Sequence, residues 1–274
     1  SAASDVYKRQ GLIRSDAPQQ LLGRGESPLA RFGEALAKAA VDRDVKAIVV
    51  RVNSRGGTVT ASDAMYRELL RFREDSGKPA VILMGDVAAS GGYYLACAGD
   101  HIVAPATCVT ASIGVIMQRV NVSEGLARLG VHSDPVISGP NKGMGSPLQP
   151  EKPEHREIYQ GMVDEFYARF VDVVRTHRAI SDDVVGEVTD GRVVTGLRAA
   201  EVGLVDEVGD VHDAFRVARE LAGLSSARLV RYHRSGQRVA SPHAAATVNE
   251  VSLIRLENEI LDPGFYYLWQ PSTP

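Results

Sequence analysis

The sequence predicts an α/β fold in which a parallel sheet has helices packed against it. Three observations indicate this class. The pattern alternates between helix and strand from Ser27 onward, the strands are apolar β-branched runs typical of parallel sheets, and glycine-rich turns follow the first two strong strands. With 274 residues, of which 44% are hydrophobic, the chain can build a large core. We expect right-handed connections between the parallel strands.

The elements are expected in a regular order. Ser27 and Pro28 predict a helix start, with Ser27 as N-cap, and an apolar face follows to Ala40. The β-branched run from Val45 to Val52 predicts the first buried strand. The later patterns predict a helix at 61–74, a strand at 79–84, a helix at 93–98, short strands at 101–104 and 113–117, a long helix at 151–177 and smaller helices at 181–188, 196–202 and 211–222.

We expect three segments along the chain. Residues 1–26 are interpreted as a leader, whose first ten residues show no helical or strand period, followed by the remnant of an N-terminal region. Residues 27–232 form the main domain. Residues 233–274 form an extension with an apolar end, Phe265 to Trp269, that is able to pack on the domain or on a neighbour.

Composition argues against several classes of function. The chain has 31 basic and 34 acidic residues, and it shows no basic patch for nucleic acid or anionic lipid. Peptides or small molecules are therefore the expected partners. Cys97 and Cys108 lack metal-type spacing and are expected to be free, buried thiols. No apolar window approaches the roughly 18 residues of a transmembrane helix.

Two glycine-rich turns lie at the C-terminal ends of the first two strands, where open α/β sheets place their sites. The first ends in Gly56 and Gly57, and the second places Ser90 before Gly91 at a helix start. There the dipole and the Gly91 N–H would favour an oxyanion. Taken alone, Ser90 can be interpreted as an ordinary N-cap serine. The pair Gly56 and Gly57 can likewise be interpreted as a tight turn. A phosphate loop is disfavoured because no lysine precedes Thr58.

A serine nucleophile needs a base, and none of the seven histidines stands in a turn like that around Ser90. Lys142 instead stands in a loop of small residues, 138–147, with no carboxylate within several positions. Under apolar cover, the cost of burying a charge would leave this amine neutral and able to take the Ser90 proton. In water, Lys142 is an ordinary surface lysine.

The joint pattern resembles signal peptide peptidase A, the protease IV family of bacterial membrane serine peptidases. Several linked motifs are more specific than any single one. They occur in the family's order and at similar spacings, and they cover about residues 28–222: DVKAIVVRVNSRGG at 44–57, AASGGYY at 88–94, SIGVI at 112–116, SGPNK at 138–142, DGRV at 190–193 and GLVDE at 203–207.

The resemblance implies a serine endopeptidase that acts on peptides without a metal or other cofactor. Matched motif by motif, Ser90 is the nucleophile and Lys142 the general base. Gly57 and Gly91 donate the two N–H groups of the oxyanion hole, and Ser112 orients the Lys142 amine through a hydrogen bond.

Two positions depart from the family pattern. Arg55 stands where relatives usually have proline, so the first turn is expected to be less rigid or to present a charge near the substrate. Gly143 replaces a residue that is often acidic, which changes the local support of Lys142. Neither departure removes a catalytic group.

The resemblance also implies the fold of the Clp protease and crotonase superfamily, a curved β/α spiral of stacked turns. Single-domain relatives form rings or domes of identical subunits, and the serine and lysine of one site come from neighbouring chains. We therefore expect no hydrogen bond between Ser90 and Lys142 within one chain. The family carries an N-terminal membrane anchor and clears signal peptides on the extracytoplasmic side of the bacterial cytoplasmic membrane, so an anchor is expected to precede this sequence.

Three other functions stay open. A crotonase-like enzyme acting on acyl-CoA shares the fold but needs a catalytic carboxylate and a CoA pocket. An α/β-hydrolase triad could combine Ser90 with Asp206 and His212, but its nucleophile turn has glycine where Ala88 stands. An inactive assembly scaffold is disfavoured because every site residue is intact.

Overall fold

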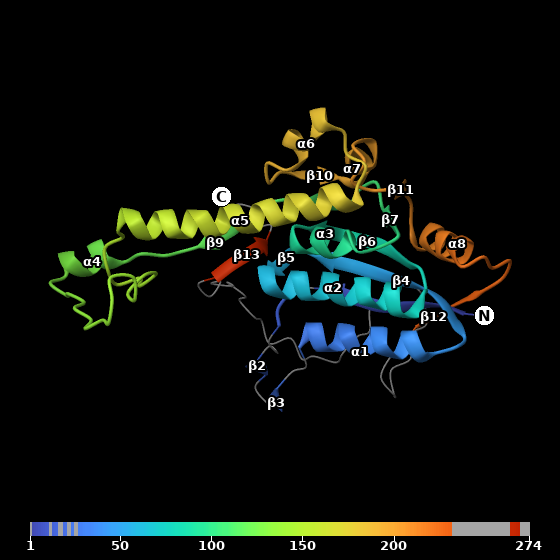
Figure 1. The fold of residues 1–274 in the computed structure, drawn as a ribbon, viewed down its shortest axis with the longest axis horizontal. Coiled ribbons are helices and arrows are strands. Elements are labelled where there is room, and N and C mark those ends of the chain that lie inside the picture. The colour runs from blue at the N-terminus through green and yellow to red at the C-terminus, as the bar shows by residue number, and fades with distance from the viewer. Residues whose placement is uncertain are drawn as a thin grey trace.

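The structure is a computed structural model that describes residues 2–10, 13–15, 19–20, 23–24, 27–231 and 264–268. Its centre is a parallel-rich sheet in the order β10-β8-β6-β4-β1-β12, with β7 and β11 continuing from β6 (Figure 1). Within this sheet, only β10 pairs antiparallel, on β8, among the described strands. The α/β class is thereby confirmed.

The strands fall into three groups. The main sheet contains β1 (Ala2–Gln10), β4 (Val45–Ser54), β6 (Ala80–Ala89), β7 (His101–Ala104), β8 (Val109–Ala111), β10 (Val193–Thr195), β11 (Glu207–Val208) and β12 (Arg228–Arg231). A smaller sheet contains β5 (Gly56–Thr58), β9 (Ile116–Gln118) and β13 (Gly264–Leu268), while β2 (Gln19–Gln20) pairs with β3 (Gly23–Arg24).

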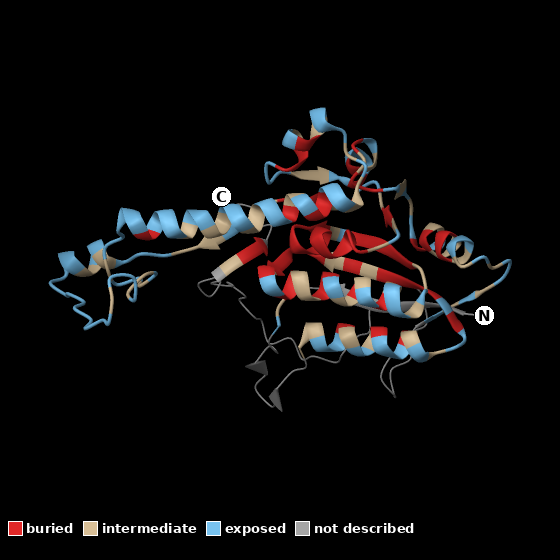
Figure 2. Ribbon diagram, viewed as in Figure 1, coloured by how far each residue is buried: buried red, intermediate tan, exposed pale blue. Residues whose placement is uncertain are grey.

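Helices cover both faces of the main sheet. They are α1 (Pro28–Val41), α2 (Val59–Ser76), α3 (Gly91–Ala96), α4 (Ser123–Arg128), α5 (Pro153–His177), α6 (Asp182–Val188), α7 (Gly196–Glu201) and α8 (Val211–Leu221). The larger apolar core joins one sheet face to α1, α2, α3 and α5, and a smaller core lies between the other face and α8 (Figure 2). The amino-terminal part of α5, with α4 and β9, extends away from the sheet as an arm (Figure 1).

Most predicted elements are present near their predicted places, and local signals explain why. The Ser27 side chain accepts a hydrogen bond from the Ala30 N–H at the start of α1, as its N-cap pattern predicts. The predicted strand at 79–84 is longer, because β6 continues through Gly85 to Ala89. Glycine is required at position 85 of this strand, because a Cβ there would lie 2.8 Å from the Asn53 side chain.

The predicted strand at 113–117 is only partly confirmed, because β9 begins at Ile116. Residues 112–115 separate β8 from β9, and the chain leaves β8 at Ala111 and Ser112, whose φ angles are 66° and 53°. A positive φ cannot continue an extended strand, so the chain turns at this point. The helix α4 also has no counterpart among the sequence predictions.

The two ends of the chain differ from expectation as well. Residues 2–10 form β1, which lies between β4 and β12 and pairs in parallel with both. Their sequence shows no strand period, so backbone pairing on two sides fixes this strand. Of the predicted extension, only 264–268 belongs to the described residues, and it packs on the domain as β13. The boundaries of the predicted segments stay predictions.

Among the helices that the structure describes, none combines the length and the apolar character needed to cross a membrane.

Candidate active site

Ser90 lies at the turn between β6 and α3, in a strained backbone conformation. Its φ and ψ angles are 54° and −118°, a combination that costs an ordinary residue about 1–3 kcal/mol. The turn is held on both sides, because the Ser90 N–H donates to the Ala111 carbonyl at 2.7 Å and the Ser90 carbonyl accepts from the Tyr94 N–H at 2.8 Å. Strain of this kind persists where the surrounding structure enforces it, as at functional turns.

The hydroxyl of Ser90 is buried and has no hydrogen-bond partner among the described residues. The residue is 1% exposed, and its Oγ makes no capping bond to α3. Ser90 stands at the N-cap position of α3, but its side chain does not cap the helix. A buried polar atom without a partner costs about 1–3 kcal/mol. A serine nucleophile is expected to have an unpartnered hydroxyl of this kind when neither its base nor its substrate is bound.

Three glycines bring the two turns into backbone contact. A Cβ on Gly91 would lie 2.3 Å from the Ser62 Oγ and 3.2 Å from the Gly57 nitrogen, and a Cβ on Gly56 would lie 2.9 Å from the Gly91 nitrogen. No side chain fits at these positions. The nitrogens of Gly57 and Gly91 thus approach one region beside Ser90, which is the placement that two oxyanion donors require.

The orientation of Gly57 follows from its neighbours in β5. The Gly56 carbonyl accepts from the Ile13 N–H at 2.7 Å, and the Thr58 N–H donates to the Ile13 carbonyl at 2.9 Å. Because consecutive strand residues direct their polar groups to opposite sides, the N–H of Gly57 faces away from Ile13. That side of β5 is the side on which β13 pairs.

Polar side chains that the sequence analysis did not single out support the first turn. The Ser54 hydroxyl accepts from the Gly56 N–H at 3.1 Å. The Asn53 side chain donates to Asp86 and accepts from the Val87 N–H, so it ties the first turn to the second. The Asn-Ser pair before two glycines was the available signal. Arg55 is exposed at the tip of this turn.

Ser112 lies beside Ser90 at the end of the neighbouring strand. Ala89 and Ala111 are partners in the β6–β8 register, and the next residue of each strand is a serine. Ser112 is buried at 6% exposure, and its N–H donates to the Arg192 carbonyl at 2.7 Å. The structure therefore brings four of the five predicted site residues together: Ser90, Gly57, Gly91 and Ser112.

Lys142 is the exception. It is exposed in the loop between α4 and α5, where its N–H donates to the Gly139 carbonyl at 3.1 Å. This loop belongs to the arm, at the far end of α5 from α3 (Figure 1). Since the Ser90 Oγ has no partner within the described chain, Ser90 and Lys142 do not hydrogen-bond to each other in one copy.

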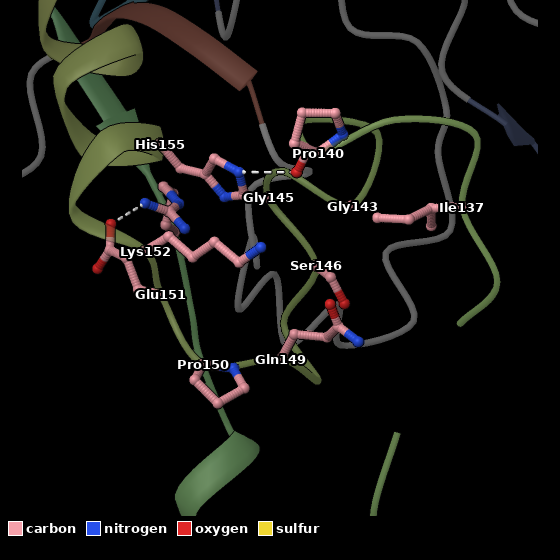
Figure 3. Close-up of a pocket in the computed structure, with 11 residues that line it drawn as sticks. Ile137, Pro140, Gly143, Gly145, Ser146, Gln149, Pro150, Glu151, Lys152 and His155 are labelled. Atoms are coloured by element: carbon pink, nitrogen blue, oxygen red, sulfur yellow. Dashed lines mark hydrogen bonds and ion pairs between the residues drawn. The ribbon is translucent and has the colours of Figure 1, made fainter. Parts of the chain in front are cut away.

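A small hollow lies against the same loop (Figure 3). The ring of His155, at the start of α5, makes a 3.3 Å contact with the Pro140 carbonyl that holds the loop against the helix. Arg119 pairs with Glu151 and lies 4.8 Å over the Tyr159 ring. Gly143 lines the hollow, whereas Ser90 does not. The hollow is therefore a feature of the arm and not of the surroundings of Ser90.

Two tyrosines fix α3 behind Ser90. The fully buried Tyr93 donates its hydroxyl to the Leu204 carbonyl at 2.8 Å. Tyr94 donates to Asp63, which also accepts from Arg169 at 2.6 Å. Burial raises the pKa of the Asp63 carboxyl, but the hydrogen bonds from Arg169 and Tyr94 outweigh burial and the net pKa is lowered. Asp63 is thus an anionic anchor for α3.

The geometry opposes a histidine triad. Asp206 forms a two-point ion pair with Arg178, at 2.8 and 2.9 Å, and accepts a third hydrogen bond from the Ile102 N–H. This carboxylate is fully engaged in structure and cannot orient His212. Within the described part of the chain, no group of three His, Cys, Asp or Glu residues could hold a metal ion.

Both cysteines are free and buried, as predicted. Burial raises the pKa of the Cys97 and Cys108 thiols to about 12, so neither is a nucleophile near neutral pH.

Comparison with known proteins gives a family match over the region that holds the site. The family model described as peptidase family S49 matches residues 72–225. The chain is 39% identical over 194 residues to protease 4 of Salmonella typhi, covering 71% of this chain and 31% of that protein. It is 37% identical over 187 residues to a putative protease of Synechocystis sp., covering 68% and 67%.

A third relative is a putative signal peptide peptidase of Enterococcus faecium, 33% identical over 222 residues, with 81% of this chain and 64% of that protein covered. The chain thus spans about a third of the Salmonella protein and about two thirds of the other two.

Proposed function

Because the chain belongs to peptidase family S49, we propose that it is a serine endopeptidase with a Ser90/Lys142 dyad shared between two copies of the chain. The observation that carries the proposal is the buried, unpartnered Ser90 hydroxyl beside the backbone nitrogens of Gly57 and Gly91. A strained turn, a hydroxyl without a partner and two converging N–H groups suit the attack of an alkoxide on a carbonyl.

The proposed reaction follows from these positions. The neutral amine of Lys142 takes the Ser90 proton, and the Ser90 oxygen attacks the peptide carbonyl to form a tetrahedral intermediate. The N–H groups of Gly57 and Gly91 stabilise its oxyanion, and each such donor contributes about 2.7–4 kcal/mol. The lysine ammonium then protonates the leaving amine, and water hydrolyses the acyl-enzyme by the same steps. Ser112 orients the Lys142 amine.

Assembly is part of the proposal because one copy holds Lys142 away from Ser90. The arm that carries Lys142 extends from the sheet, so an adjoining copy can receive it (Figure 1). We expect a closed ring or dome in which each arm completes the neighbouring site. A closed assembly would also give Lys142 the apolar cover that it lacks here. The curved Clp protease and crotonase spiral is the proposed fold for each subunit.

The proposed substrates are extended apolar peptides. Released signal peptides are the proposed natural class, at the extracytoplasmic side of a bacterial membrane, with an anchor outside this sequence. One relative is named a putative signal peptide peptidase, which supports this class. No cofactor takes part in the proposed chemistry.

The test compares hydrolysis of an unfolded apolar peptide by wild type, Ser90→Ala and Lys142→Ala. The control is Lys152→Ala, which removes another exposed lysine next to the same hollow. We expect wild type and the control to cleave and the two site variants to be inactive. Cleavage by both site variants would reject the dyad.

Mixing the inactive variants tests the shared site. If Ser90 and Lys142 come from different copies, an equal mixture reassembled from subunits contains sites with both groups intact. Random mixing predicts recovery of about a quarter of wild-type activity. No recovery, with both variants folded and assembled as wild type, would show that the dyad is not shared.

A further inference from the structure

His155 is the one buried residue of the arm. The structure describes every residue from Gly114 to Arg169, and within this stretch only His155 is buried, at 7% exposure. This part of the chain therefore contains no fully packed apolar side chain that could fix its shape. Polar contacts must hold it instead, and the buried imidazole makes one of them.

The loop between α4 and α5 has few hydrogen bonds to the helices beside it. At its start, the Val131 N–H donates to the Leu126 carbonyl at 3.0 Å. From residue 132 to residue 146, the contact between His155 and the Pro140 carbonyl is the only hydrogen bond to a helix that the structure describes (Figure 3). The middle of this loop, which carries Lys142, is therefore fixed to α5 at one point.

Pro140 occupies the second position of a β-turn that ends at Lys142. The Lys142 N–H donates to the Gly139 carbonyl at 3.1 Å, which closes the turn over Pro140 and Asn141. Proline suits the second position of both type I and type II turns, and asparagine at the third position tolerates the positive φ that type II requires. The sequence is therefore compatible with both turns, which differ by a flip of the peptide between Pro140 and Asn141.

The structure contains one of these two turns. Among the described residues, no asparagine has a positive φ angle, so the turn over Asn141 is not of type II. The Pro140 carbonyl belongs to the peptide that would flip. Because a carbonyl only accepts, the His155 ring donates this bond through a proton on Nε2. A flip would turn the carbonyl away from the buried ring, so His155 stabilises the observed turn.

We propose that His155 is a positioning residue for Lys142, because it selects the turn that directs this lysine toward Ser90 of a neighbouring copy. The inference rests on the proposed function, in which Lys142 is the general base. The direction in which the chain leaves the turn at Lys142 follows from the orientation of the peptide that His155 holds. Without that bond the loop exchanges between two turns, and the amine spends less time within reach of Ser90.

Two substitutions of His155 test the hydrogen bond. His155→Gln keeps an N–H donor near the position of Nε2, whereas His155→Met fills a similar space without a donor. With an unfolded apolar peptide, we expect His155→Met to lower kcat by about ten- to 100-fold with KM unchanged, and His155→Gln to keep most of the wild-type kcat. The control is His132→Met, which removes an exposed histidine of the same loop and should leave kcat unchanged. Wild-type kcat in His155→Met would overturn the inference.

Mixing inactive variants separates positioning from folding. In a mixture of Ser90→Ala and Lys142→Ala, the Ser90→Ala copy supplies the lysine. His155→Met added to this copy is expected to lower the recovered activity by about ten- to 100-fold, because His155 acts on the lysine of its own chain. Added to the Lys142→Ala copy instead, it should leave the recovery unchanged. Equal losses in the two mixtures would show that His155 supports folding or assembly, and they would overturn the positioning role.

Trypsin reports on the turn without any peptidase activity. Within residues 129–155, Lys142 is the only lysine or arginine after which trypsin cuts readily, because Lys152 precedes a proline. At a dilution that gives single chains, Ser90→Ala with His155→Met should be cut after Lys142 about two- to tenfold faster than Ser90→Ala alone, the factor that corresponds to one lost hydrogen bond. Equal cutting rates would overturn the inference.

The combined results distinguish this inference from the proposed function. If wild type cleaves the peptide and His155→Met cleaves it equally fast, the positioning role fails and the Ser90/Lys142 dyad stands. If trypsin shows the expected release of the turn but wild type cleaves no peptide, the peptidase proposal fails. The role of His155 in catalysis then fails with it, and only the contact between the ring and the turn remains.

Discussion

The Ser90 N–H donates a 2.7 Å hydrogen bond to the carbonyl oxygen of Ala111. This bond joins the ends of β6 and β8 where both strands leave the extended conformation, since Ser90, Ala111 and Ser112 all have positive φ angles. Three strained residues in contact are costly, and such strain concentrates where a site needs fixed geometry. Ser90, the proposed nucleophile, and Ser112, the predicted lysine-orienting serine, are therefore positioned by one shared backbone contact.

Replacing Ser112 tests its positioning role. Ser112→Ala removes the hydroxyl proposed to hold Lys142, and kcat is expected to fall by up to about 100-fold with KM unchanged. The pH–rate profile should shift as well, because the base loses a hydrogen-bond partner. Ser112→Gly relieves the positive φ but also lacks the hydroxyl, so it should be equally slow. A glycine variant with wild-type activity would show that only backbone strain matters.

Replacing Gly91 tests the close backbone contact. Gly91→Ala places a methyl group 2.3 Å from the Ser62 Oγ, so the turn at Gly91 must shift and the overcrowding is expected to cost about 1–3 kcal/mol. We expect a lower midpoint in urea unfolding and a loss of kcat of at least tenfold. The control is Gly33→Ala in α1, where a methyl meets nothing within 4 Å. That change is expected to stabilise the chain by about 0.5–1 kcal/mol. Equal urea midpoints for Gly91→Ala and Gly33→Ala would contradict the close contact between Gly91 and Ser62.

The ion pair of Asp206 and Arg178 predicts a pH dependence of stability. Burial raises the pKa of Asp206, but the hydrogen bonds from Arg178 outweigh it, and the folded pKa lies below the ordinary value of 3.8. A lowered carboxyl pKa stabilises the folded chain above its unfolded pKa, and this stabilisation is lost as pH falls through the folded pKa. Asp206→Asn should therefore cost about 1.5–3 kcal/mol at pH 7, and the difference should shrink below about pH 4.

Urea unfolding of wild type and Asp206→Asn between pH 7 and pH 3 measures this difference. Asp190→Asn is the control, because Asp190 pairs with Arg192 at an exposed site where water and salt screen the pair. A difference for Asp206→Asn that stays constant down to pH 3 would contradict the lowered pKa.

The two thiols should resist modification in the folded chain. Because burial raises their pKa to about 12, little thiolate exists at pH 8 and reagent cannot reach either sulfur. We expect no alkylation of Cys97 or Cys108 by iodoacetamide in native protein, full alkylation of both in urea, and peptidase activity unaffected by the reagent. Loss of activity alongside native labelling would indicate a thiol in the mechanism.

Local signals made much of the fold predictable. The Ser27 cap, the β-branched run of β4 and the long apolar period of α5 each determine an element by themselves. Elements fixed by distant contacts were missed. Nothing in residues 2–10 predicts a strand, and β6 continues past Gly85 through its pairing with β4 and β8.

In the candidate site too, some features follow from local sequence patterns and others depend on distant contacts. Ser90, Gly57, Gly91 and Ser112 follow strand ends, and parallel strands bring such ends together, so their meeting could be predicted from the motifs. The place of Lys142 could not be derived from the motifs alone, because the single chain leaves this residue exposed and away from the other four. The pairing of β13 beside Gly57 was equally hidden, since it joins residues about 210 positions apart without any local pattern.

The place of β1 in the main sheet also constrains synthesis. Its only described neighbours there are β4 and β12, so β12 reaches the other strands through β1 alone. An emerging polypeptide can align β1 with β4 early, but that edge stays open until residue 231 has left the ribosome. Until then the exposed backbone of β1 is able to pair with another nascent chain.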